Sequence, residues 1–382
     1  MTLFRAAAMT IVMMLAGGVT WAQPRPIMIG MTAPLSGPNA AYGLGLQHGA
    51  RLAMARANAA GAAGGRSLEL LVLDDGGDAL RAAANARQLL QRGVVALTGA
   101  HGASVTAAIA QVIAPEGGSG PIVPLVAPAT GADSLREPPR PGVFHLRAGT
   151  AEEASSAVLH LDTIGVTRYA LLTQADALGD TGRDRVLHEL TRIAIRPAAN
   201  ERLVATPSIT DIQRAVTLLC ATNPEAVILA LDAEHAFTAL ASARKLRCAA
   251  HYVVFSETGA VLSAWPEGTS GSHPQAGLLV TQVVPHPNQR SHRLVEEYQR
   301  ALSAQGAGPG SYPSLEAYLF TRLIQDALGY CERDPGRTCL LQVLAARAIE
   351  LPGLTVRFGS AQRQPNPYVE ITMLDAQGRF RR

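Results

Sequence analysis

The chain has 382 residues, of which 48% are hydrophobic and 16% charged, and this composition excludes a disordered or fibrous protein. Its 33 basic residues stand against 30 acidic residues with no basic block, which argues against a nucleic-acid partner held by phosphate contacts. Lys245 is the sole lysine, and its neighbours fit neither a Schiff-base lysine nor a phosphate-binding loop.

The N-terminal residues predict an export signal. Arg5 is followed by an apolar stretch and by Thr20-Trp21-Ala22, the pattern typical of a cleaved signal peptide over residues 1–22. The alternative is a membrane anchor, but the apolar run is shorter than the roughly 20 residues that span a bilayer. No cysteine follows this run, so a lipoprotein is not indicated. We therefore expect a soluble, exported protein.

Short apolar runs alternate with helix-period segments in the first part of the chain. Strands are expected at residues 27–32, 68–73, 94–98 and 122–126. Helices are expected at residues 43–60, 78–91 and 104–114. This alternation predicts a parallel sheet with helices on both faces.

A second series of the same kind follows the Pro-rich stretch at residues 138–142 and a connecting strand at 143–147. Its strands are expected at residues 169–173, 203–205, 227–231 and 252–255, with helices starting near Gly182, Thr210 and Glu234. Two helix starts fit a capping box, at Thr150 to Glu153 and at Thr210 to Gln213.

The last part of the chain contains too little sheet for a third domain of this kind. A strand is expected at residues 277–284, helices at 288–304, 314–330 and 338–350, and strands at 355–358 and 368–374. We expect the helices to return to the first lobe and the last strands to join the second. The predicted fold is therefore α/β, with two doubly wound parallel-sheet lobes. The first comprises residues 24–147 and 284–352, and the second residues 148–283 and 353–382, joined by three crossings.

Four cysteines in an exported chain favour disulfides. Cys331 and Cys339 flank the turn pair Pro335-Gly336, which favours a local disulfide. Cys220 and Cys248 each end a predicted helix before a strand, so they could lie at the same edge of a sheet. Buried free thiols are the alternative for this second pair.

The motif search predicts no catalytic residue, no metal site and no cofactor. Neither the phosphate-binding loop nor the Gly-x-Ser-x-Gly elbow occurs. His188 and Glu189 match the start of the His-Glu-x-x-His motif of zinc proteases, but Arg192 occupies the position of the second histidine. The acidic pair Asp74-Asp75 ends a strand, a position where carboxylates usually cap a helix or line a cleft. These absences favour a binding protein over an enzyme.

Candidate binding residues follow from strand ends, because ligands of doubly wound sheets bind outside the carboxyl ends of the strands. Helix amides near Gly102 and Ser104 could hold an anion, with a hydroxyl from Ser104 or Thr130, although Ser104 could simply cap the helix. Tyr42 offers a ring and a hydroxyl, or packs beneath its own loop. In the second series Thr150, Asp176, Asp232 and Glu257 occupy equivalent ends.

Several segments resemble one known family. They are Ile-Gly-Met-Thr-Ala-Pro-Leu-Ser-Gly-Pro-Asn-Ala-Ala-Tyr-Gly43, Val-Ala-Pro-Ala-Thr-Gly-Ala-Asp-Ser-Leu135, Val143-Phe-His-Leu-Arg147, Gly277 to Pro285, Tyr312 to Tyr318 and the Val356-Arg-Phe-Gly359 ending. The chain resembles the branched-chain amino-acid-binding proteins, which are periplasmic solute receptors of ABC importers with the two-lobed type I periplasmic-binding-protein fold. The resemblance implies closure of the two lobes over a small solute and recognition of the closed form by a permease.

The resemblance also implies roles for individual residues. The first-lobe loops would hold the α-carboxylate of an amino acid, Tyr42 matches the tyrosine of the first loop, and Glu257 matches the acid that holds the α-ammonium. Capping of the following helix is the alternative role of Glu257. The expected ligand-binding residues are Tyr42, Gly102, Ala103, Ser104, Ala127, Thr130, Thr150, Asp176, Asp232 and Glu257.

Two departures from the family pattern leave the ligand open. Gly149-Thr150 stands where many relatives have Ser-Tyr, and Leu178 stands where an aromatic residue is common. The pocket is therefore expected to be larger or less aromatic, and amino acids, amides and aromatic or short carboxylates all remain candidates. A sensory receptor working with a membrane signalling partner is the alternative function, and an exported enzyme would need a nucleophile or metal site that the motif search does not find.

Overall fold

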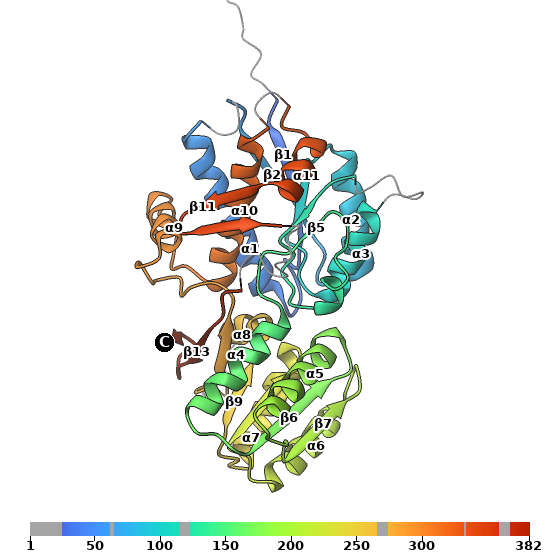
Figure 1. The fold of residues 1–382 in the computed structure, drawn as a ribbon, viewed down its shortest axis with the longest axis vertical. Coiled ribbons are helices and arrows are strands. Elements are labelled where there is room, and N and C mark those ends of the chain that lie inside the picture. Colours follow the sequence, from blue (N-terminus) through green and yellow to red (C-terminus); the bar gives the residue numbers. More distant parts are fainter. Residues whose placement is uncertain (1–24, 62–64, 115–121, 266–273, 332–333, 359–366) are drawn as a thin grey trace, which may run out of the picture.

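The computed structural model describes residues 25–61, 65–114, 122–265, 274–331, 334–358 and 367–382. The expected signal peptide lies outside these residues. The chain forms two lobes, each built on its own sheet, and the predicted α/β class is confirmed (Figure 1). No helix within the described ranges is long and apolar enough to cross a membrane.

Lobe 1 contains a five-stranded parallel sheet in the order β2-β1-β3-β4-β5. The strands are β1 Ile27–Ala33, β2 Leu68–Asp74, β3 Ala96–Thr98, β4 Leu125–Val126 and β5 Val143–Phe144. The helices are α1 Ala40–Ala59, α2 Ala79–Gln91 and α3 Ala103–Ile113, followed late in the chain by α9 Arg293–Ala304, α10 Tyr312–Gly329 and α11 Arg337–Ala346. A short 3-10 helix, η1, covers Asp133–Leu135.

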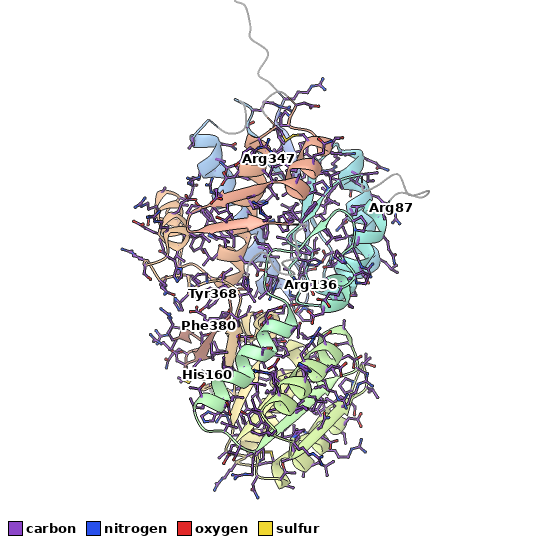
Figure 2. All side chains as sticks on the ribbon, viewed as in Figure 1. Arg87, Arg136, His160, Arg347, Tyr368 and Phe380 are labelled. Atoms are coloured by element: carbon purple, nitrogen blue, oxygen red, sulfur yellow. A yellow bond between two sulfur atoms is a disulfide. The ribbon has the colours of Figure 1, made fainter. Side chains whose placement is uncertain are left out.

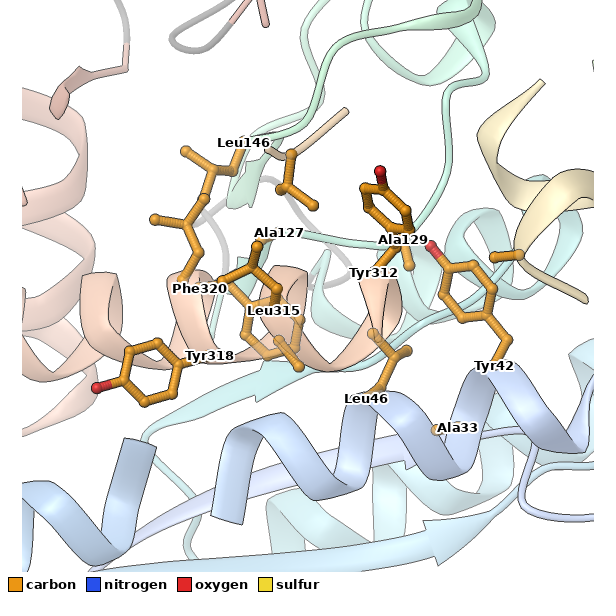
Figure 3. Close-up of a cluster of buried hydrophobic side chains, with 14 of the residues drawn as sticks. Ala33, Tyr42, Leu46, Ala127, Ala129, Leu146, Tyr312, Leu315, Tyr318 and Phe320 are labelled. Carbon is orange, nitrogen blue, oxygen red and sulfur yellow. The ribbon is translucent and has the colours of Figure 1, made fainter. Parts of the chain in front are cut away.

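The late helices join lobe 1 through the packing of α10 on α1 (Figure 1). A Cβ on Gly49 of α1 would lie 1.8 Å from the carbonyl oxygen of Ser314, so the two helices approach as closely as they do only because Gly49 has no side chain. Leu46 of α1 faces Leu315 of α10 in a buried cluster that also includes Phe320 (Figure 3). Through Glu316, α10 also reaches Arg147 at the junction with the second lobe.

Lobe 2 contains a seven-stranded sheet in the order β14-β13-β10-β9-β8-β6-β7. The strands are β6 Tyr169–Gln174, β7 Ala199–Leu203, β8 Ala226–Ala230, β9 His251–Val254, β10 Leu279–Gln282, β13 Glu370–Leu374 and β14 Phe380–Arg381. The helices are α4 Thr150–Thr163, α5 Ala177–Arg192, α6 Ile209–Ala221, α7 Ala233–Lys245 and α8 Ser256–Ser263. Strands β6 to β10 are parallel, while β13 and β14 add antiparallel strands at one edge.

The C-terminal part of lobe 1 differs from expectation. The helix expected at 338–350 ends at Ala346, and β11 Ala348–Leu351 pairs antiparallel with β12 Leu354–Arg357 across a Pro-Gly turn. The expectation that residues 355–358 join the second sheet is therefore wrong. Ile349 and Val356 alternate with exposed neighbours and are buried in the core of lobe 1, which is the pattern of a one-sided hairpin.

Two further differences concern segments without a clear apolar signal. The strand expected at 203–205 is β7, which begins four residues earlier. Its start was not predicted because this edge strand carries Asn200, Glu201 and Arg202, whereas a buried strand would be apolar. Both capping boxes are displaced: the amide of Gly149 donates to Glu152 at the start of α4, and Ser208 pairs with Asp211 at the start of α6.

The expected disulfide between Cys331 and Cys339 is present, and the second pair, for which free thiols were the alternative, is bridged as well. Cys220 at the end of α6 is bonded to Cys248 after α7, and Cys331 after α10 is bonded to Cys339 in α11. The first bridge ties two neighbouring helices at one end of the lobe 2 sheet, and the second closes the short connection between α10 and α11 in lobe 1. The four described cysteines are therefore all paired.

Candidate functional site

A cavity of about 280 Å³ lies between the two lobes. It is lined from lobe 1 by Asn39, Gly77, His101, Gly102, Ala103, Ser104, Thr130 and Ala132, and from lobe 2 by Asp176, Ala177, Leu178, Asp232, Ala233, Glu257, Thr258 and Val261. Most of these residues follow the carboxyl end of a strand. The cavity therefore has the position that doubly wound sheets provide for a ligand.

The strand order explains where on each sheet the cavity lies. In lobe 1 the order reverses between β1 and β3, and in lobe 2 it reverses between β6 and β8. Loops leave opposite faces of the sheet at such a reversal and leave a crevice between them. Asn39 and His101 follow the two lobe 1 strands, and Asp176 and Asp232 follow the two lobe 2 strands. The two crevices thus face each other across the cavity.

The lobe 1 wall is built around the N-terminus of α3. Gly102 is the residue preceding this helix, its φ is +85°, and no side chain caps the helix. Ala103 and Ser104 of the first turn line the cavity, so Ser104 is not the cap that the sequence left open. The first amides of a helix have no acceptor within the helix and carry a partial positive charge. This wall is therefore suited to an anionic group.

A second lobe 1 loop, residues 130–132, is held rigidly beside α3. The buried Arg136 donates to the carbonyl oxygens of Thr130 at 2.7 Å and Arg147 at 3.1 Å, and it lies next to the junction of the lobes (Figure 2). The carbonyl of Gly131 accepts from the amide of Thr150 at 2.8 Å. A Cβ on Gly131 would lie 2.7 Å from the hydroxyl oxygen of Thr150, so no larger residue fits here without a shift.

The lobe 2 wall is acidic. Asp176 caps α5 by accepting from the amide of Gly179 at 2.7 Å, and Asp232 caps α7 by accepting from the amide of His235 at 3.0 Å. Burial raises the pKa of Asp176 above its ordinary value, and the charge of Asp232 adds to the effect. Asp232 also contacts the ring of His235 at 2.8 Å. Both carboxylates therefore lie at the cavity while serving as helix caps.

Glu257 connects the two walls. Its Oε1 accepts from the amide of Gly131 at 2.6 Å, so a residue in the first turn of α8 in lobe 2 bonds to a loop of lobe 1. No side chain caps α8, and the capping role left open for Glu257 is therefore not what the geometry shows. Burial raises the pKa of Glu257 to about 7, although the nearby Arg147 and the bond from Gly131 oppose this rise. A cation placed beside this carboxylate would keep it ionised.

Arg147 lies at the centre of a buried network beneath the cavity. Its guanidinium lies 3.5 Å from both Glu153 of lobe 2 and Glu316 of α10 in lobe 1. It also donates to the Tyr42 hydroxyl at 3.0 Å and to the hydroxyl of Ser256. Burial disfavours the charged guanidinium, but the surrounding acids, Glu316 foremost, raise the pKa of Arg147 well above its usual range.

The same network explains the displaced capping box of α4. Glu153, which we expected to cap that helix, is buried and accepts from the Ser256 amide at 2.8 Å and from the Thr281 hydroxyl. It therefore pairs with the arginine of the first crossing between the lobes, and Glu152 takes the capping position. Polar groups from both lobes are thus joined at the hinge.

The structure brings seven of the ten expected binding residues to the cavity: Gly102, Ala103, Ser104, Thr130, Asp176, Asp232 and Glu257. The other three lie nearby but are not among its lining residues. The Tyr42 hydroxyl donates to Glu316 at 2.8 Å, and its ring packs on His101 with centroids 4.3 Å apart. Ala127 and Thr150 are buried at the hinge. Of these three, Tyr42 contacts the cavity lining through the ring of His101.

His101 lines the cavity and is 8% exposed, but it was not among the residues expected from the sequence. It lies in the turn after β3, which was expected to contribute to the site. The position of His101 could therefore be predicted, but its role could not. Arg147 and Glu316 lie in segments that resemble the family, but no role was predicted for either residue. Within the described ranges, no three His, Cys, Asp or Glu side chains are arranged to hold a metal ion. The groups that line the cavity are suited to hydrogen bonding and charge pairing.

Comparison with known proteins agrees with this geometry. The sequence profile of a family described as periplasmic binding protein matches residues 26–379. A Leu/Ile/Val-binding protein homolog 1 from Brucella abortus (strain 2308) is 33% identical over 116 residues, which is 30% of this chain and 30% of that protein. The chain thus aligns with less than a third of that relative's length.

Solved structures match over nearly the whole length. A possible leucine/isoleucine/valine-binding protein from Rhodopirellula baltica SH 1 superposes with a TM-score of 0.81 at 25% identity, covering 94% of this chain and 96% of that one. A substrate-binding periplasmic protein from Ralstonia solanacearum gives a TM-score of 0.79 at 26% identity, covering 92% of this chain and 98% of that one. These proteins share the two-lobed arrangement described above.

Proposed function

Because the chain belongs to the periplasmic binding protein family, we propose that it is the substrate-binding receptor of an ABC importer and that it binds an α-amino acid or a similar small carboxylate or amide. The observation that carries the proposal is the polarity of the cavity, with an uncapped helix N-terminus on one wall and carboxylates on the other. A zwitterion matches both walls at once. Residues 1–22 would direct the protein to the periplasm and be removed.

The α-carboxylate would bind to lobe 1. The free amides at the start of α3 would donate to it, and the hydroxyls of Ser104 and Thr130 lie on the same wall. Because these donors are mostly backbone groups, this part of the cavity would accept any small carboxylate. Amide oxygens could take the same place with weaker binding, since they carry no full charge.

The α-ammonium would bind to Glu257. An ammonium would pair with this carboxylate in an environment where burial otherwise favours its neutral form. The bond from Gly131 fixes the side chain at the boundary between the lobes, so a ligand that engages Glu257 would contact both of them. The names of the Brucella and Rhodopirellula relatives, which refer to leucine, isoleucine and valine, are consistent with an amino-acid ligand.

Transport would depend on closure of the lobes. A solute would dock on lobe 1, the second lobe would close over it about the crossings that include Arg147, and a permease would recognise the closed form. Closure requires a ligand that binds the closed state more tightly than the open one. Groups that contact the ligand from both lobes supply that difference. A sensory receptor would use the same closure to signal to a membrane partner, and the gene's neighbours would distinguish these two roles.

A ligand screen tests the proposal. The protein without residues 1–22 would be unfolded in guanidinium with its disulfides intact, dialysed to remove any retained ligand and refolded. It would then be screened by thermal shift against L-amino acids, their amides and small carboxylates such as benzoate, because a ligand that binds the folded state raises the melting temperature. We expect stabilisation by one group of L-α-amino acids. Stabilisation only by carboxylates without an amine would keep the receptor function and remove the role of Glu257.

A further inference from the structure

The cavity has an unbalanced charge. Three carboxylates, from Asp176, Asp232 and Glu257, lie on the lobe 2 side, and no arginine or lysine is found among the described residues that line it. His101 is the one lining imidazole in this part of the chain, and burial, together with Arg147, lowers its pKa to about 3, so it is neutral. An amino acid with an uncharged side chain would pair with Glu257 and leave two acids without a cationic partner from the ligand.

Asp176 and Asp232 lie close enough to interact. They follow β6 and β8, which are neighbouring parallel strands of the sheet. Gln174 at the end of β6 donates to Asp232 at 3.2 Å. Each carboxylate uses one oxygen atom to cap its own helix, and the other oxygen of Asp232 lies 2.8 Å from Nδ1 of His235. A cation between them would relieve their mutual repulsion while leaving the caps in place.

A second observation at the same cavity is a buried polar side-chain atom without a partner in the described part of the chain. The Nε2 atom of His101 is buried and has no hydrogen-bond partner among the residues that the structure describes, although its ring lines the cavity and is held against Tyr42. Buried polar atoms in folded proteins nearly always have a partner. The neutral ring can accept from an N–H group or donate to an oxygen. Either an N–H group or an oxygen of a ligand would supply what this atom lacks, so the atom points to a polar ligand in this cavity.

We propose that the preferred ligand is an amino acid with a second cationic group in its side chain, of the lysine, ornithine or arginine class, held between Asp176 and Asp232. This inference rests on the proposed function. With the carboxylate at α3 and the α-ammonium at Glu257, the side chain would extend toward the other lobe 2 residues of the cavity, which include Leu178. When the lobes close, the two carboxylates lose water, and an aliphatic side chain would leave this loss uncompensated.

Three probes test the inference by titration calorimetry on the refolded protein. L-norleucine has the carbon skeleton of L-lysine without its side-chain ammonium, and 1,5-diaminopentane has both cations without the carboxylate. We expect L-lysine to bind at least tenfold more tightly than either. Equal or tighter binding of L-norleucine would overturn the inference and leave the proposed function intact. Equal binding of 1,5-diaminopentane would retain the cation site but overturn the amino-acid function. Failure of all three to bind would overturn the inference, while the ligand screen above would still decide the proposed function.

Variants locate the effect. Asp176→Asn and Asp232→Asn keep good helix caps, because asparagine caps a helix about as well as aspartate. We expect each to weaken L-lysine binding at least fivefold and to change L-norleucine binding less than twofold. Asp180→Asn is the matched control, since Asp180 lies in the first turn of α5, is half exposed and pairs with Arg202 outside the cavity. An equal loss with Asp180→Asn, or no loss with either cavity variant, would overturn the assignment of the second cation to these two residues.

Discussion

The two walls of the cavity are built from different kinds of groups. Lobe 1 presents backbone amides at the uncapped start of α3, where Gly102 holds a positive φ. Lobe 2 presents side-chain carboxylates that cap α5 and α7. Each wall lies where the strand order of its own sheet reverses, and the parallel strands of the two sheets have the same order. The fold therefore determines where the walls lie, and the helix caps determine the sign of their charge. The same βα unit can therefore attract an anion or a cation, according to whether its helix carries an acidic cap.

The largest expected effect concerns the network that joins the walls. Arg147→Met would leave Glu153 and Glu316 buried without their shared cation, and removal of one partner of a buried ion pair costs about 3 to 5 kcal/mol. We expect a loss of this size in the free energy of unfolding, measured in urea. Arg300→Met, at an exposed pair with Glu296 on α9, should change it by less than about 0.5 kcal/mol. Equal effects would mean that the network does not stabilise the junction.

The disulfides distinguish the lobes by stability. The Cys220–Cys248 bridge in lobe 2 closes a separation of 28 residues and the Cys331–Cys339 bridge in lobe 1 a separation of 8. Chain entropy predicts losses of about 3.5 and about 2.5 kcal/mol when each pair is replaced by alanine. Hydrogen exchange on each double variant should show the loss confined to the lobe that contains the bridge. Uniform loss of protection would indicate that the lobes unfold together.

The buried acid of lobe 2 should make the stability of the empty protein depend on pH. The pKa of Glu257 rises from an ordinary value of 4.5 to about 7 through burial. Between these values the folded protein binds more protons than the unfolded chain, so the free energy of unfolding falls as the pH rises from about 4.5 to about 7. Relative to Glu257→Gln, the wild type should lose roughly 2 to 3 kcal/mol over this range. Parallel pH profiles of the two proteins would contradict the assignment.

The smallest expected effect concerns the backbone of the lobe 1 wall. Gly102→Ala should cost about 1 kcal/mol of stability, because alanine is strained at a φ of +85°. Gly165→Ala is the matched control, since Gly165 has a φ of +86°, has open space around its Cβ position and does not line the cavity. Only Gly102→Ala should weaken binding of carboxylates with and without an amine. Unchanged binding would remove the start of α3 from the site.

The parts of the fold that could be predicted from the sequence are those with apolar periodicity. The strands at 27–33 and 169–174 are buried runs whose burial and β-branched or apolar content set them apart from the helices between them. The edge strand at 199–203 carries polar residues and has no such signal. The hairpin at 348–357 was read in part as helix, because a four-residue strand is too short for its alternation to compete with the helical pattern before it.

The residues of the candidate site that could be predicted from the sequence are those that directly follow a strand. Asp176, Asp232 and Glu257 follow strands, and the sheets bring them to one cavity. Tyr42 could not be placed, because its hydroxyl bonds to Glu316, 274 residues away in sequence. The orphaned Nε2 of His101 is likewise a property of the packing around it, which no local pattern reveals.

The central claim is that Glu257 holds the α-ammonium of an amino acid, and one comparison tests it most directly. Titration calorimetry would measure the wild type and Glu257→Gln with the L-amino acid that binds most tightly and with the carboxylic acid that lacks its α-amine. We predict that Glu257→Gln weakens binding of the amino acid by about 1.5 to 3 kcal/mol, the range for a hydrogen bond to a charged group. Binding of the plain carboxylate should be nearly unaffected. A loss of less than about 0.5 kcal/mol for the amino acid would contradict the claim.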